Sequence, residues 1–158
     1  MWKKYKPYIL SSAVALAVGG LSALLTKDNM DLAKDYIMPP RSPPGVVFPI
    51  VWSILYILMG IASALVYLNK SKNPDGAKNA LTVYAASLIF NFFWSIIFFN
   101  LHAFLASFVW LLILWALILI CIIKFKPFSK AASYLMIPYL LWVSFAGYLN
   151  IMIYILNR

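Results

Sequence analysis

The chain has 158 residues, of which 65% are hydrophobic and only 11% are charged, and its formal net charge is +9. Soluble domains carry about 25% charged residues, so this composition excludes a soluble globular protein and indicates an integral membrane protein. The basic excess does not indicate a nucleic-acid partner, because the lysines and arginines are divided among short segments and form no large patch.

Five long stretches contain no charged residue, and each is close to the roughly 20 apolar residues that a membrane-spanning helix needs. The alternation with a period of two that is typical of a β-barrel is absent. We therefore predict one domain over residues 1–158, an all-α bundle of five transmembrane helices. The predicted helices cover about 8–25, 46–68, 80–99, 103–123 and 131–156.

The first predicted loop, residues 26–45, is long for a compact bundle, and such loops are often lids. Residues 31–36 are expected to form a helical turn capped by Asp31. Prolines 39, 40, 43 and 44 are expected to hold a stiff, extended segment over the mouth of the bundle. A merely solvated linker is the alternative interpretation.

The later breaks are shorter. Residues 73–76 read Asn-Pro-Asp-Gly, a turn sequence, and residues 100–102 leave room only for a tight reversal. This reversal requires the third and fourth helices to be antiparallel neighbours.

Basic residues are unevenly divided between the two sides of the predicted bundle. Most lie at the N-terminus and in the loops around residues 70–78 and 124–130, which share one side. The positive-inside rule then predicts an inside N-terminus and an outside C-terminus, as suits a bacterial plasma membrane. Residues 1–25 also have features of a secretory signal peptide, but the apolar run exceeds the roughly 7–15 residues of such a signal.

Several kinds of chemistry lack the side chains they require. No charged or histidine residue lies well inside a predicted helix, which disfavours proton-coupled transport. His102 is the only histidine and Cys121 the only cysteine, so a Ser–His protease and a metal site are unsupported. No glycine-rich phosphate loop is present. A site built from aromatic rings, amides and hydroxyls remains.

Aromatic residues are abundant, with 11 Phe, 10 Tyr and 6 Trp. Helical spacing gathers many of them into three stripes. Helix packing is the plain explanation, but an amide such as Asn91 near mid-membrane needs a partner. Three uncharged stripes with indole rings suit a flat, mostly apolar ligand. The stripes are Pro49, Trp52, Tyr56, Met59 and Ser63; Ser87, Asn91, Trp94 and Phe98; and Pro138, Trp142, Phe145 and Leu149, with Ala146 beside them.

Three segments resemble motifs of the TspO/translocator protein family (TspO/MBR), once called peripheral-type benzodiazepine receptors. They are residues 42–56 (SPPGVVFPIVWSILY), 91–99 (NFFWSIIFF) and 138–150 (PYLLWVSFAGYLN). The resemblance covers the whole chain, including its length and its long first loop. It departs from the family at Arg41-Ser42, where many members have a tryptophan before the Pro-Pro pair. Leu149, Tyr154 and Arg158 match the family's sterol pattern only loosely.

This resemblance implies a five-helix bundle in the lipid bilayer, usually a homodimer. It implies binding of porphyrins such as protoporphyrin IX and haem, and of isoquinoline carboxamide and benzodiazepine-type ligands, in a pocket under the first loop. Members are proposed to transport tetrapyrroles or to promote light- and oxygen-dependent breakdown of protoporphyrin IX. The tetrapyrrole would be ligand or substrate, with no cofactor required, and no conventional catalytic constellation is present.

The resemblance also assigns site residues. Trp52 and Trp142 would be the pocket tryptophans and the carriers of photo-oxidation, because an indole can donate an electron to a photoexcited porphyrin. The expected ligand-binding residues are Tyr36, Pro44, Phe48, Trp52, Tyr56, Asn91, Trp94, Trp142 and Ala146. The function expected is tetrapyrrole binding with photo-oxidative degradation. The alternatives are a passive carrier of small amphipathic molecules and a ligand-sensing stress protein.

Overall fold

The computed structural model describes residues 1–158 and contains helices without strands. Five helical segments are long and apolar enough to cross a membrane, which confirms the predicted five-helix bundle and an integral membrane protein. The long helices are α1 (Trp2–Thr26), α2 (Val47–Leu68), α3 (Pro74–Ser95), α4 (Phe104–Phe125) and α6 (Ile137–Leu156). Shorter elements are η1 (Lys27–Asn29), η2 (Leu32–Lys34), η3 (Lys70–Lys72), the π-helical turn η4 (Ile96–Asn100) and α5 (Lys130–Leu135).

Two helices begin earlier than the apolar stretches indicate. α1 starts at Trp2, and α3 starts at Pro74. The Asn-Pro-Asp-Gly sequence is therefore a helix start and not a free turn. The side-chain oxygen of Asn73 accepts a hydrogen bond from the Gly76 N–H at 3.0 Å, and Pro74 occupies the first helical position, where its missing N–H costs nothing.

The last span is one segment in the sequence but two helices in the structure. α5 begins after Ser129, whose hydroxyl accepts a hydrogen bond from the Ala132 N–H at 3.1 Å. It ends at Leu135, and α6 begins at Ile137 with Pro138 in its first turn. A proline fits the first turn of a helix and interrupts one that is already running, so its position accounts for the break.

Residues 27–46 join α1 to α2 and are called the first loop below. The helical turn expected after Asp31 is present as η2. Asp31 does not cap it, however, because its side chain makes no capping hydrogen bond and instead lies 3.6 Å from the Lys34 ammonium group.

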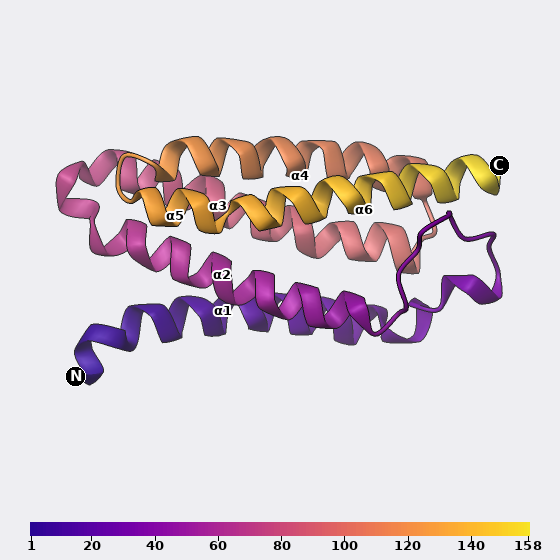
Figure 1. Ribbon diagram of the computed structural model, residues 1–158, viewed down its shortest axis with the longest axis horizontal. Coiled ribbons are helices and arrows are strands. Elements are labelled where there is room, and N and C mark those ends of the chain that lie inside the picture. The colour runs from indigo at the N-terminus through magenta and orange to yellow at the C-terminus, as the bar shows by residue number, and fades with distance from the viewer.

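Helices α1 and α2 pack together along much of their length (Figure 1). At Gly60 the backbone of α2 lies so close to Ser12 of α1 that a Cβ atom would overlap it. Gly19 of α1 similarly leaves space for the Tyr56 ring of α2. Small residues thus allow this close contact, as is common between transmembrane helices. α4 packs against both α3 and α6 on the other side of the bundle.

A buried amide joins three helices near the end of the bundle that carries the C-terminus. The Asn150 side-chain oxygen of α6 accepts hydrogen bonds from the Trp94 indole of α3 at 3.0 Å and from the Ser107 hydroxyl of α4 at 3.1 Å. Its amide nitrogen donates to the Phe104 carbonyl at 2.7 Å. Asn150 is fully buried, so its polar atoms are paired inside the bundle.

The two chain ends lie at opposite ends of the bundle (Figure 1). The first loop and the C-terminus share one end, whereas the N-terminus lies at the other. α2 packs along α5 but makes few contacts with α6. The space between α2 and α6 is the location of the candidate site.

Candidate functional site

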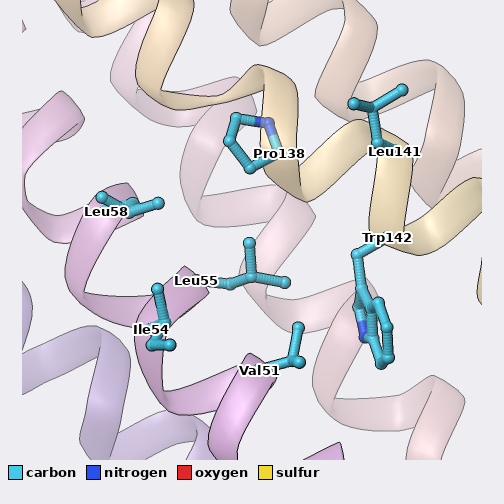
Figure 2. Close-up of a pocket in the computed structure, with 7 residues that line it drawn as sticks. All are labelled: Val51, Ile54, Leu55, Leu58, Pro138, Leu141 and Trp142. Carbon is cyan, nitrogen blue, oxygen red and sulfur yellow. The ribbon is translucent and has the colours of Figure 1, made fainter. Parts of the chain in front are cut away.

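A groove with a volume of about 390 Å³ lies between α2 and α6. Figure 2 shows its walls, with the Trp142 ring pointing from α6 into the space that faces α2. None of the lining side chains is charged. The lining residues are Val51, Ile54, Leu55, Leu58, Pro138, Leu141 and Trp142.

Aromatic rings cross from α2 to α6 beside this groove. Phe48 meets Trp142 with ring centroids 5.8 Å apart, and Trp52 meets Tyr139 at 6.1 Å. Both pairs have edge-to-face geometry, and Trp52 also stacks on Tyr56 at 5.7 Å. We call these five residues the aromatic cluster. Because its members come from two helices that otherwise touch little, the cluster is the main link between them beside the groove.

Two polar groups belong to this region. Asn91 of α3, only 1% exposed, donates a hydrogen bond from its side-chain nitrogen to the Tyr139 hydroxyl at 3.0 Å. This bond holds the Tyr139 ring in place against Trp52. The Trp142 indole nitrogen is buried and has no hydrogen-bond partner. A buried donor without a partner costs about 1–3 kcal/mol, so a ligand with an acceptor atom would be favoured there.

The structure brings together most of the predicted site residues. Phe48, Trp52, Tyr56 and Trp142 belong to the aromatic cluster, and Asn91 contacts it through Tyr139. Ala146 is buried on α6, one turn beyond Trp142.

Three other predicted site residues lie apart from the groove. Tyr36 of the first loop packs its ring against His102 and Phe104, with centroids 5.4 and 4.9 Å away. Pro44 is exposed in the same loop. Trp94 is 6% exposed, and its indole is occupied by the hydrogen bond to Asn150.

Sequence reasoning missed Tyr139 and the aliphatic wall of the groove. Val51, Leu55 and Leu58 follow the spacing of one helix face, a signal that the sequence contains. That spacing is common to every helix of a membrane bundle, so it does not mark a groove. Tyr139 lies next to Pro138 in a segment that carries the family resemblance. Its contacts with Trp52 and Asn91 depend on which face of α6 points inward, and the sequence alone does not give that orientation.

The site contains no side chains suited to metal binding, and no group of three His, Cys, Asp or Glu residues gathers anywhere in the structure. A second groove, about 720 Å³, lies between the start of α4 and the end of α6. His102 is its only residue with a metal-binding side chain, and a single imidazole does not hold a metal ion. The chemistry available at the first groove is therefore that of indoles, phenols and one amide.

Comparison with known proteins assigns the chain to a family. The TspO/MBR family profile matches residues 11–156. The chain is 37% identical to the tryptophan-rich protein TspO of Chlorobaculum tepidum, over 99% of both chains. It is 33% identical to the TspO of Archaeoglobus fulgidus, over 94% of this chain and 95% of the relative. It is 31% identical to the translocator protein of Ovis aries, over 71% of this chain and 66% of the relative. These matches extend the three motif segments to nearly the whole length, and this chain belongs to the TspO/MBR family.

Proposed function

We propose that this protein binds a tetrapyrrole, such as protoporphyrin IX or haem, at the aromatic cluster, and that it promotes light- and oxygen-dependent degradation of protoporphyrin IX. The observation that carries the proposal is the aromatic contact between α2 and α6, which sets Trp52 and Trp142 on the two helices that flank one uncharged groove. A flat ring system is favoured between such side chains. The groove volume lies within the range of about 300–1,000 Å³ that is typical of ligand pockets.

The proposed chemistry assigns different roles to the residues of the site. An indole that contacts a photoexcited porphyrin can donate an electron to it, and molecular oxygen is the oxidant consumed. Trp52 and Trp142 are the residues proposed for this role. Asn91 is a positioning residue, because it acts through the Tyr139 ring that packs on Trp52.

The test is titration of protoporphyrin IX into the purified protein in lipid nanodiscs, first in the dark and then under light with oxygen. Trp52→Phe and Trp142→Phe should each weaken binding about fivefold, or roughly 1 kcal/mol, and slow photobleaching. Trp115→Phe is the matched control, because Trp115 lies on α4 and bonds Ser144 away from the groove. Unchanged affinity and bleaching in both groove variants would refute the residue assignment.

A passive carrier is the second candidate. It is favoured by the apolar, uncharged groove and by the name of the Ovis aries relative, a translocator protein. Release of protoporphyrin IX from loaded proteoliposomes in the dark would favour the carrier. Binding with neither flux nor bleaching would favour a ligand-sensing protein.

We also propose that the protein is a homodimer in the plasma membrane, with its N-terminus inside, and that it accepts isoquinoline carboxamide or benzodiazepine-type ligands. Lysines at the N-terminal end of the bundle support the orientation. Cysteine accessibility from the two sides of sealed vesicles tests it, and chemical crosslinking in native membranes tests the dimer.

A further inference from the structure

Hydrogen bonds attach the first loop to the rest of the bundle, whereas only apolar side chains stand at the opening of the groove. We propose that ligands reach the aromatic cluster from within the bilayer, through the groove between α2 and α6. The first loop, residues 27–46, stays attached to the helix ends during entry, and we call it the strap. The identity of the ligand rests on the function proposed above, whereas the route of entry rests on the contacts described next.

The strap is fastened to α6 by paired hydrogen bonds. The Ile37 N–H donates to the side-chain oxygen of Asn157 at 2.8 Å, and the Asn157 amide nitrogen donates to the Ile37 carbonyl at 3.0 Å. The same amide nitrogen also lies 2.8 Å from the Ile153 carbonyl of its own helix, which orients it. Farther along the loop, the Tyr148 hydroxyl donates to the Pro40 carbonyl at 3.0 Å. Two positions of the loop are thus attached to one helix.

The start of the strap is fastened to the other helices. The Asn29 amide donates to the side-chain oxygen of Asn100 at 2.9 Å, and Asn100 donates to the Leu25 carbonyl at 3.0 Å. Leu32 is buried, and the Tyr36 ring packs edge-on against Phe104 of α4. Entry under the strap would require several of these contacts to break together.

The groove has no comparable closure. Ile54 and Leu141 stand at its rim, 53% and 64% exposed, and in a membrane such side chains face lipid acyl chains. The lining side chains are aliphatic except for Trp142, whose indole nitrogen has no hydrogen-bond partner, so no side-chain hydrogen bond or ion pair joins the two walls. A ligand dissolved in the bilayer can therefore pass by rotation of aliphatic side chains, without breaking polar contacts.

The first experiment compares two ways of changing access. Protoporphyrin IX is delivered in the dark from preloaded vesicles, and its association is followed by stopped-flow quenching of tryptophan fluorescence. Leu141→Trp, which narrows the groove, should slow association about tenfold. The double variant Asn157→Ala, Tyr148→Phe, which loosens the strap, should change it less than about twofold. Faster association in the strap variant, with no effect of Leu141→Trp, would overturn the proposal.

A second experiment does not depend on porphyrin. The only native cysteine, Cys121, is buried, so a nitroxide spin label can be attached selectively to an introduced cysteine. The label is placed in the groove at Leu58→Cys. The control is Val46→Cys, at the exposed end of the first loop where α2 begins. The Leu58 label should collide more with membrane-soluble oxygen than with a water-soluble nickel chelate, and the Val46 label should show the reverse. Preference of the Leu58 label for the chelate would overturn bilayer entry even if porphyrin binds. Failure of porphyrin to bind, with the expected label accessibility, would refute only the proposed function.

Discussion

Replacing Asn150 by leucine removes the amide that joins α3, α4 and α6 while keeping a similar side-chain volume. The variant loses three interhelical hydrogen bonds and leaves the Trp94 indole N–H without its partner, whereas the Phe104 carbonyl still accepts from the Ser107 hydroxyl at 2.9 Å. Interhelical bonds in membranes average about 0.6 kcal/mol each, so we expect a loss of about 2 kcal/mol in the free energy of unfolding. Asn150 is fully buried, and its bonds are a polar link among α3, α4 and α6 that is separate from the Asn91–Tyr139 bond between α3 and α6.

The assay is reversible unfolding in mixed micelles at increasing mole fractions of dodecyl sulfate, followed by helical circular dichroism. Asn69→Leu is the matched control, because the Asn69 amide donates only to the Leu65 carbonyl of its own helix, at 2.8 Å. It should lose less than about 1 kcal/mol. If Asn150→Leu is as stable as the wild type, apolar packing replaces the amide fully and the bonds contribute nothing net. That result would refute the reasoning.

Two further substitutions test the packing and the helix start. Gly60→Ala places a Cβ atom against the Ser12 backbone and should cost about 1–3 kcal/mol in the same unfolding assay. Gly20→Ala, where nothing lies within 4 Å, should be neutral or stabilising, and equal losses in both would contradict the close-contact account. Asn73→Ala removes the acceptor for the Gly76 N–H and should cost about 1 kcal/mol, with earlier hydrogen exchange in the first turn of α3. Unchanged exchange there would argue against the cap.

The number and character of the spans were predictable because charge is excluded from hydrocarbon. Charged residues mark three of the four breaks between apolar stretches, the polar Asn100 and His102 mark the other, and each stretch became one helical span. The helix ends were less predictable, because a helix continues past the hydrocarbon wherever a cap is available. Asn73 and Ser129 supply such caps, and both are polar residues that also occur in turns.

The site was predicted in part, because helical spacing says which residues share a face but not which face points inward. The structure sets Trp52 against Tyr56 and joins Asn91 to the same cluster through Tyr139, whereas their part in ligand binding stays a prediction. Trp94 lies in an aromatic stripe of the same kind as Trp52 and Trp142, and was therefore predicted to bind ligand. In the structure, however, its indole N–H is used in a hydrogen bond to Asn150. That pairing joins helices far apart in the sequence and has no local signal.

The break between α5 and α6 makes the width of the groove a property of the backbone. α5 follows α2 closely, and beyond Pro138 the chain continues as a separate helix that α2 scarcely touches. Exchanging Val51, Ile54 or Leu58 for another side chain of similar size therefore alters the lining without closing the opening. Ligand preference and the shape of the entrance can vary independently, so the groove offers a scaffold for redesign toward other flat, lipid-soluble molecules.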